Sequence, residues 1–157
     1  MRKDKINYYL DIADAVRSRS TCLRRQYGAI IVASDEIVAT GYNGAPRGRK
    51  NCDELGRCVR QELNIPSGQR YELCRSVHAE ANAIISASRK ETIGSTLYLA
   101  GRDASTGELL SGTTSCSMCR RLIINAGIET VICRISEREY TITPVSDWIE
   151  NDDTIGT

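Results

Sequence analysis

Apolar side chains recur along this chain with two different periods, which predict helices and strands in turn. Residues 6–18 place their apolar side chains on one helical face, with charged side chains opposite. Residues 27–34 form a β-branched run that is typical of a buried strand. Residues 36–44 follow a turn at Ser34 and Asp35, so we expect them to form the antiparallel neighbour of that strand.

The second half of the chain continues the alternation of helix and strand. We expect, in order, a helix over 78–90, a strand over 95–101, a hairpin or loop over 102–114, a helix over 116–126 ending at a left-handed Gly127, a strand over 128–135, and a fifth strand with a short end over 140–149. Alternation of this kind predicts the α/β class, with one mixed sheet of about five strands and helices on both faces. A length of 157 residues suits one domain over 1–157.

Two segments fall outside this pattern. Residues 44–75 are rich in Gly, Pro, Arg and Cys, and they are too long for an idle connection in a small domain. This segment, the insert, should therefore have a function or a staple of its own. The acidic residues 150–157 are expected to form a frayed tail.

Composition and charge narrow the classes of protein that remain. The formal net charge is +1 and aromatic residues make up 5%, which gives no general basic field or stacking surface for nucleic acid. No apolar run approaches the roughly 20 residues that cross a bilayer, and the N-terminus lacks the pattern of a signal peptide. We therefore predict a cytoplasmic protein without membrane partners, in which the seven cysteines are ligands, nucleophiles or core residues.

A histidine and a glutamate stand in the apolar start of the helix predicted over 78–90. His78 is the only histidine of the chain, and Glu80 follows two residues later. Cys116 and Cys119 open the next predicted helix, where free N–H groups and the helix dipole favour thiolates. Two thiolates and one imidazole leave one tetrahedral position open for water, as catalytic zinc sites do. Glu80 could then carry the proton that such a water releases.

Each part of this pattern has a simpler interpretation when it is taken alone. A single histidine on an apolar face is more often a core residue than a ligand, and a C-x-x-C pair in a cytosolic α/β protein can be a redox pair. A redox pair of the thioredoxin type would follow the first strand and would need neither His78 nor Glu80. The combination of H-A-E at one helix start with C-x-x-C at the next favours a metal site.

Four segments together resemble the zinc-dependent cytidine and deoxycytidylate deaminases, and most of all the deoxycytidylate branch: "GYNGAPRG", "HAEANAI", "STLYLAG" and "CSMCRRLIINAGIETVI". The resemblance covers roughly residues 5–135. It implies a cytidine-deaminase-like α/β/α sandwich that hydrolyses dCMP to dUMP and ammonia, with dUMP feeding thymidylate synthesis. It also implies that His78, Cys116 and Cys119 bind zinc. Glu80 would activate the water, protonate the ring nitrogen and help ammonia to leave.

The resemblance extends to the substrate. The long insert after "GYNG" distinguishes the deoxycytidylate branch from tRNA adenosine deaminases and riboflavin-pathway deaminases. By resemblance Asn43 bonds the sugar, whereas the simpler interpretation is a plain Asn-Gly turn. A monophosphate needs cations, and arginine offers a planar fork of donors. The candidates are Arg24, Arg25, Arg47 and Arg49, and the sequence leaves open which of them serve substrate, regulator or solubility.

Four further cysteines lie outside the predicted strands and core helices. Cys22, Cys52, Cys58 and Cys74 could form a closed structural zinc site that staples the insert, because four thiolates complete a tetrahedron. Some deoxycytidylate deaminases, which this chain resembles, have a second zinc near the same insert. The alternative is four free thiols packed as small hydrophobic side chains. Cys133 lies in an apolar strand and is expected in the core.

The resemblance also implies assembly and control, and it has departures. It implies a homo-oligomer, often a hexamer, with dCTP and dTTP as effectors and Mg²⁺ bound with the nucleotide.

The sequence departs from the family pattern at three places. Ser115 stands where the family has proline, and serine is a good N-cap. Tyr27 stands where relatives often carry valine, and the segment 102–114 is longer than usual. The alternatives are deamination of another nucleotide, nucleoside or base, and a binding or competence-associated protein that keeps the fold with little turnover.

Overall fold

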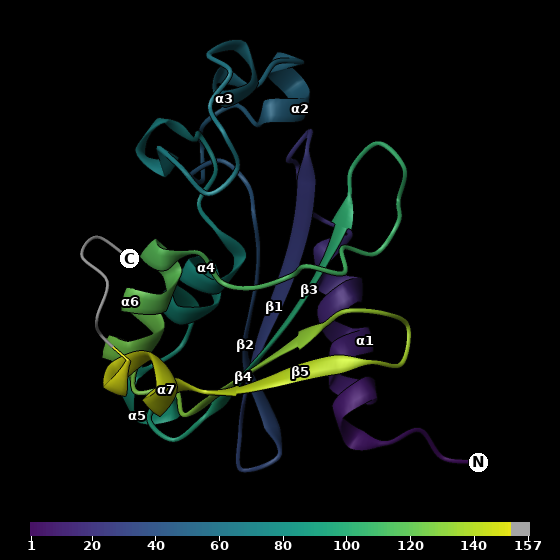
Figure 1. Ribbon diagram of the computed structural model, residues 1–157, viewed down its shortest axis with the longest axis vertical. Coiled ribbons are helices and arrows are strands. Elements are labelled where there is room, and N and C mark those ends of the chain that lie inside the picture. Colours follow the sequence, from purple (N-terminus) through teal and green to yellow (C-terminus); the bar gives the residue numbers. More distant parts are fainter. Residues whose placement is uncertain (152–157) are drawn as a thin grey trace.

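Five strands form one mixed sheet in the order β2-β1-β3-β4-β5 (Figure 1). The strands are β1 (Arg25–Ala33), β2 (Glu36–Tyr42), β3 (Thr96–Asp103), β4 (Thr130–Arg134) and β5 (Tyr140–Pro144). β1 pairs antiparallel with β2 and β3, β3 runs parallel to β4, and β4 is antiparallel to β5. This computed structural model describes residues 1–151. It confirms the predicted α/β class with a mixed five-stranded sheet.

The turn between the first two strands is a two-residue hairpin, as expected. Ser34 and Asp35 have φ angles of 51° and 62°, the left-handed conformation that two-residue hairpins of type I′ require. The hairpin register then pairs Gly28 with Tyr42. This pairing places the N-terminal part of β1 beside the C-terminal end of β2, where the insert begins.

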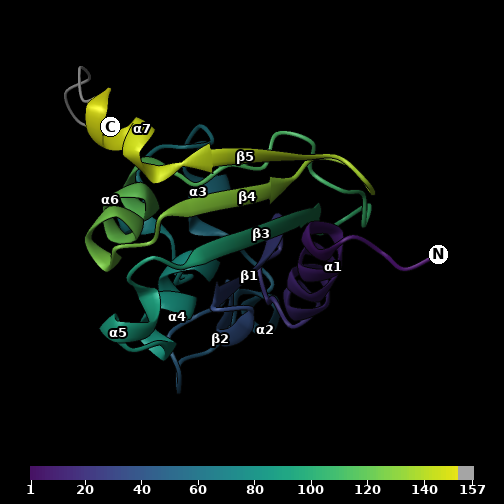
Figure 2. The ribbon, with the colours of Figure 1, turned by 90° about the horizontal axis from the view of Figure 1, so that it is seen from below.

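Helices cover both faces of the sheet (Figure 2). On one face lies α1 (Lys5–Arg17), whose buried Leu10 and Ala13 pack with Ile30 and Tyr98 of the strands. On the other face lie α4 (Ala79–Ser86), α5 (Arg89–Thr92), α6 (Ser117–Ala126) and α7 (Val145–Glu150). The core on this second face joins residues of α4, α6 and α7 to side chains of β1, β3 and β4. It fixes α4 and α6 beside each other.

The helix predicted over 78–90 is interrupted, so that boundary was wrong. α4 ends at Ser86, and Ala87 is extended with ψ of 162°. Ser88 then caps a new short helix, because its side chain accepts the backbone N–H of Glu91 while the Glu91 carboxylate accepts the N–H of Ser88. The predicted left-handed end of α6 is confirmed, with φ of 79° at Gly127.

The insert extends beyond the end of the sheet and carries only short elements (Figure 1). These are α2 (Cys52–Leu55), α3 (Val59–Glu62) and a 3₁₀ turn (Tyr71–Leu73). Two backbone hydrogen bonds between Gly44 and Val77, of 3.2 and 2.7 Å, close the base of the insert. The chain therefore returns to the sheet immediately before His78.

Gly41 allows α4 to approach β2 closely. A Cβ atom at this position would lie 2.4 Å from both the carbonyl oxygen of Ala79 and the backbone nitrogen of Ala83. Only a glycine fits such a contact, so the position of the helix that begins after His78 depends on it.

Two predictions concern other parts of the chain. Among residues 1–151 the structure has no helix that is both long enough and apolar enough to cross a bilayer. Of the expected frayed tail 150–157, Glu150 ends α7 and Asn151 follows it, and residues 152–157 lie outside the described part.

Candidate active site

The N-termini of α4 and α6 bring three side chains with metal-binding atoms together. His78 is the N-cap of α4, Cys116 is the N-cap of α6, and Cys119 is buried within the first turn of α6. The Nδ1 atom of His78 lies 3.5 Å from the Sγ atom of Cys116 and 3.4 Å from that of Cys119. In residues 1–151 no other three His, Cys, Asp or Glu side chains have ligand atoms within 4.8 Å of one another.

The spacing of these three atoms fits zinc. Zinc lies about 2.3 Å from sulfur and about 2.0–2.1 Å from imidazole nitrogen, and a tetrahedral angle between such bonds separates sulfur from nitrogen by about 3.5 Å. The observed separations of 3.4 and 3.5 Å match this value. Three protein ligands leave one position open, which is the arrangement of catalytic rather than structural zinc sites.

Electrostatics at the helix starts favour sulfur as an anion. A hydrogen bond from the Cys119 thiol and the proximity of His78 lower the pKa of Cys116 to about 4. The backbone N–H of Cys119 also points to the Cys116 sulfur, at 3.5 Å. The same hydrogen bond with Cys116, together with burial, raises the pKa of Cys119, so the pair retains one proton until a cation displaces it.

Glu80 lies in the first turn of α4, and its side chain faces the same cavity. Only 5% of its surface is exposed, and burial raises the pKa of its carboxyl group. A raised pKa makes a carboxylate a stronger base, which suits it to take a proton from water. Glu80 is therefore placed for proton transfer beside the three ligand side chains.

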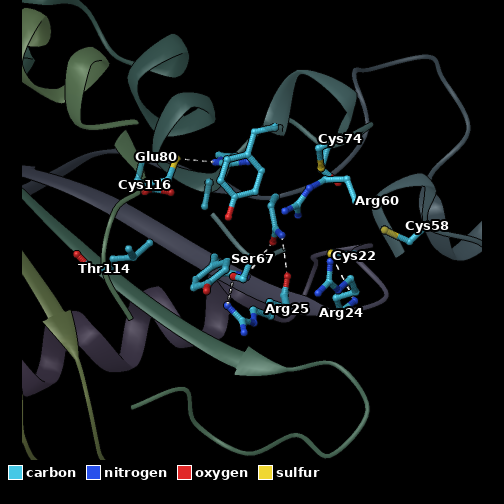
Figure 3. A pocket seen from close by; sticks show the side chains of 17 residues that line it. Cys22, Arg24, Arg25, Cys58, Arg60, Ser67, Cys74, Glu80, Thr114 and Cys116 are labelled. Atoms are coloured by element: carbon cyan, nitrogen blue, oxygen red, sulfur yellow. Dashed lines mark hydrogen bonds between the residues drawn. The ribbon is translucent and has the colours of Figure 1, made fainter. Parts of the chain in front are cut away.

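His78, Glu80 and Cys116 line one end of a cavity of about 100 Å³ (Figure 3). Glu80 and Cys116 lie at this end, and Arg24, Arg25 and Arg60 lie farther along the cavity. The walls come from β1, the loop after β2, the insert, and Thr114 before α6. The cavity thus has one end with His78, Glu80 and Cys116 and another end with cationic side chains.

Asn43 lines this cavity, but most of its side chain is already bonded. Its Oδ1 atom accepts the backbone N–H of Tyr27 at 2.8 Å and the hydroxyl of Ser20 at 2.5 Å. Its Nδ2 atom donates to the carbonyl oxygen of Arg25 at 2.8 Å. One N–H of Nδ2 is left to offer a ligand, so Asn43 orders the edge of β1 as well as lining the cavity.

The four candidate arginines do not all line the same cavity. Arg24 and Arg25 line the active-site cavity. Arg47 and Arg49 line a second cavity of about 410 Å³, together with Arg19. Sequence reasoning missed Arg60, which is 7% exposed. Its burial results from folding of the insert, and no periodic pattern around α3 signals it.

The remaining four cysteines line a third cavity of about 590 Å³ beneath the insert. Cys22, Cys52, Cys58 and Cys74 form no disulfide, and no three of them have sulfur atoms within 4.8 Å of one another, as the ligand atoms of His78, Cys116 and Cys119 have. Burial raises the pKa of Cys52, which keeps its thiol neutral. Cys133 is buried in β4 as expected.

The three departures from the family pattern have clear positions. Ser115 was expected to cap α6, but the cap is Cys116, and Ser115 is buried before it. Tyr27 packs its ring on β3, where a Cβ atom on Gly101 would lie 2.5 Å from the ring, and it lines the active-site cavity. The segment 102–114 turns back through a bridge between Arg102 and Leu109 and leads to Thr114 in the cavity wall.

Comparisons with known proteins agree with this geometry. A model of the cytidine and deoxycytidylate deaminase zinc-binding region matches residues 3–135. The chain is 36% identical to a deoxycytidylate deaminase of Mycobacterium phage D29, over 83% of this chain and 94% of the relative. It is 33% identical to a deoxycytidylate deaminase of Schizosaccharomyces pombe over 83% of its own length, which spans only 37% of that larger protein.

A solved structure shows the same architecture. The dCMP deaminase of cyanophage S-TIM5, in complex with dCMP and dUMP, superimposes with a TM-score of 0.59 and 25% identity. The match covers 85% of this chain and 83% of that one. The α/β sandwich predicted from the sequence is thereby confirmed.

Proposed function

Because the chain belongs to the cytidine and deoxycytidylate deaminase family, we propose that it hydrolyses dCMP to dUMP and ammonia. The observation that carries the proposal is the approach of His78 to Cys116 and Cys119, at distances that suit zinc, beside the buried Glu80. The dUMP produced would supply thymidylate synthesis. Membership of the family also means that this region binds zinc.

The protein side chains have separate tasks in this reaction. His78, Cys116 and Cys119 would hold the zinc ion, which supplies Lewis-acid activation of a water molecule. Glu80 takes a proton from that water as its oxygen attacks C4 of cytosine, and it delivers a proton to N3 of the ring. Glu80 then takes the proton of the new C4 hydroxyl group and passes it to the amino group, so that the C4–N bond breaks, the C4 carbonyl forms, and ammonia leaves. Burial of Glu80 keeps solvent from competing for these protons.

The cationic end of the cavity supports a nucleotide rather than a nucleoside. Arg24 and Arg25 lie on its wall, and arginine binds phosphate through paired hydrogen bonds. The free N–H of Asn43 is available to a sugar hydroxyl. Arg47 lies in the other cavity and is the weaker candidate for the substrate phosphate.

A comparison of substrates with zinc-loaded protein tests the proposal. Ammonia release should be faster with dCMP than with deoxycytidine, CMP or dAMP at equal concentration. Equal rates for dCMP and deoxycytidine would contradict the nucleotide assignment. Absence of turnover with every one of them, in protein with a full complement of zinc, would favour the alternative of a binding protein with the deaminase fold.

A second, structural zinc is part of the proposal. Cys22, Cys52, Cys58 and Cys74 line one cavity, so a modest rearrangement of the insert could gather them around an ion. Elemental analysis should then give about two zinc ions per chain, falling to about one when Cys58 and Cys74 are both replaced by serine. One zinc per chain in the wild-type protein would leave these residues as ordinary thiols.

Control by nucleotides and oligomer formation complete the proposal. The second cavity presents Arg19, Arg47 and Arg49, a cationic lining that suits the phosphates of dCTP or dTTP with Mg²⁺. Either nucleotide should change the dependence of rate on dCMP concentration, and alanine at Arg47 and Arg49 should remove that change.

Light scattering should give the mass of a homo-oligomer, with a hexamer as the expected state.

A further inference from the structure

Arg60 is a buried cation that the insert holds in the wall of the active-site cavity. It lies on α3 and is only 7% exposed. Its Nη2 atom donates to the carbonyl oxygens of Pro66 and Gln69 at 3.0 Å, and its Nε atom donates to Gln69 at 3.2 Å. The guanidinium also lies over the ring of Tyr71, 4.4 Å from its centre. These contacts fix the plane and direction of the guanidinium.

The charge of Arg60 has no carboxylate partner. In residues 1–151 no carboxylate oxygen lies within 4.0 Å of its nitrogen atoms. Its Nη1 atom makes no hydrogen bond to a described residue, although the side chain lines the cavity. Burial of an unpaired charge is costly, and buried charges are normally paired. An anion that enters the cavity can therefore pair with a buried cation at this position.

A second cation approaches from the sheet. Arg25 of β1 lines the same cavity, and its Nη1 atom donates to the hydroxyl of Ser67 in the insert at 3.0 Å. Figure 3 shows Arg25, Ser67 and Arg60 on the side of the cavity away from Glu80 and Cys116. The insert and the sheet thus each contribute a cation, and the Ser67 hydroxyl, which accepts from Arg25, can still donate to an anion.

We propose that Arg60 binds the phosphate of the nucleotide substrate, with Arg25 and Ser67 opposite it. This assignment rests on the proposed function and adds the residue of the insert that selects a nucleotide over a nucleoside. A phosphate carries the negative charge that would pair with the Arg60 guanidinium, and its oxygen atoms accept hydrogen bonds from the parallel N–H donors of that group. Arg60 is a specificity residue in this account, because it touches the substrate far from C4.

Tyr71 places the phosphate relative to the metal ligands. One side of its ring carries the Arg60 guanidinium, and its ring also makes an edge contact with the His78 imidazole, with centres 4.7 Å apart. The phosphate ligand and the zinc ligand thus pack against the same ring. A nucleotide anchored at Arg60 would have its base directed toward His78 and Glu80.

A purely structural role for Arg60 makes a different prediction. Its hydrogen bonds to Pro66 and Gln69 hold the loop that follows α3, and their loss would loosen the insert for every substrate. Loss of a phosphate ligand would slow only substrates that carry the phosphate. The loss of rate with dCMP relative to the loss with deoxycytidine therefore distinguishes phosphate binding from a purely structural role.

The experiment measures kcat/KM for dCMP and for deoxycytidine in zinc-loaded Arg60→Met, Arg60→Lys and wild-type protein. Arg60→Met should lower the value for dCMP about 10- to 100-fold and that for deoxycytidine less than about threefold. Arg60→Lys should recover part of the loss, since it keeps the charge but not the fork. Arg57→Ala is the matched control, because Arg57 lies on the same insert and pairs with Glu62 at the surface.

Three results would overturn the assignment. They are equal losses for dCMP and deoxycytidine, no loss for dCMP, and failure of inorganic phosphate to compete with dCMP in the wild-type protein. The phosphate competition needs no variant, so it holds even if Arg60→Met does not fold. If wild-type protein does not turn over dCMP, the proposed function fails separately, and calorimetry of dUMP and deoxyuridine still tests Arg60. Weaker binding of dUMP alone by Arg60→Lys would support the assignment, and equal binding would refute it.

Discussion

The sheet with its helices and the insert contribute different parts of the active site. The N-termini of α4 and α6, packed against the sheet, hold His78, Glu80, Cys116 and Cys119. The insert holds Arg60 through loop carbonyl oxygens and an aromatic ring, without a regular helix of more than four residues. In the proposed function, the chemical step would therefore depend on regular structure, whereas the choice of substrate would depend on an irregular segment.

Glu80→Gln gives the largest expected effect and tests the sheet side of this division. The amide has the shape of the carboxyl group but cannot carry a proton, so kcat should fall about 10²- to 10⁴-fold. The fall should be the same for dCMP and deoxycytidine, since Glu80 acts on the base. Ammonia release measures the rate, and elemental analysis should show unchanged zinc. A loss confined to dCMP would contradict the division of roles.

Gly41→Val tests whether α4 must lie so close to β2. The added Cβ would meet backbone atoms of Ala79 and Ala83 at 2.4 Å, and backbone cannot rotate away as a side chain can. We expect a loss of about 1–3 kcal/mol in the free energy of unfolding. Activity toward dCMP and deoxycytidine should fall in parallel, because the helix carries Glu80.

Gly112→Ala is the matched control for this substitution. Nothing lies within 4 Å of a Cβ atom at Gly112, so its stability should remain within about 0.5 kcal/mol of wild type. Thermal denaturation of zinc-loaded proteins makes the comparison. An unchanged melting temperature in Gly41→Val would show that α4 can move without cost, and the sheet would then not fix the metal centre.

The sheet and the metal centre could be predicted from the sequence because each leaves a local pattern. Strands and helices follow the spacing of apolar residues, and the proposed zinc ligands follow H-A-E and C-x-x-C at two helix starts. The break at Ala87 was missed, since the capping box of Ser88 and Glu91 competes with an otherwise continuous helical pattern. The end of α4 is therefore set by local hydrogen bonds rather than by the spacing of apolar residues.

The insert could not be predicted in the same way. The position of Arg60 depends on the carbonyl oxygens of Pro66 and Gln69 and on the ring of Tyr71, which come together only when the segment has folded. By sequence, Arg47 was as good a candidate for binding the phosphate as Arg24 or Arg25, yet it lines another cavity. Likewise the bonded state of Asn43 depends on its contact with β1, which no spacing in the sequence reveals.

Asp14→Asn tests the electrostatic support of the sheet side. Burial disfavours the charged form of Asp14, but hydrogen bonds from Arg102 and Arg17 outweigh it and lower its pKa below the ordinary 3.8. The charged form therefore stabilises the folded state above about pH 4, and this stabilisation is lost as the pH falls through the lowered pKa. We expect Asp14→Asn to cost about 1–2 kcal/mol at pH 7, because its side chain is 19% exposed and its partners are partly solvated.

Denaturation at several pH values measures this difference. The gap between wild type and Asp14→Asn should be constant from pH 5 to 8 and should narrow below about pH 4. Glu62→Gln is the control from the insert, where the ion pair with Arg57 is at the surface and should leave the melting temperature unchanged. A gap that persists at pH 2 would assign the loss to packing rather than to charge.

Tyr71 gives the smallest expected effects and the sharpest test of the boundary between the two regions. Tyr71→Phe removes only an acceptor for the exposed N–H of Gly68, so kcat/KM for dCMP should stay within about twofold of wild type. Tyr71→Leu removes the ring under the Arg60 guanidinium and should lower that value about 3- to 10-fold. Because the same ring touches His78, kcat/KM for deoxycytidine in Tyr71→Leu shows which of the two contacts matters. A loss limited to dCMP means that the ring supports the phosphate ligand. An equal loss for deoxycytidine means that the insert also orients His78, a proposed zinc ligand, and so contributes to the chemical step as well as to the choice of substrate.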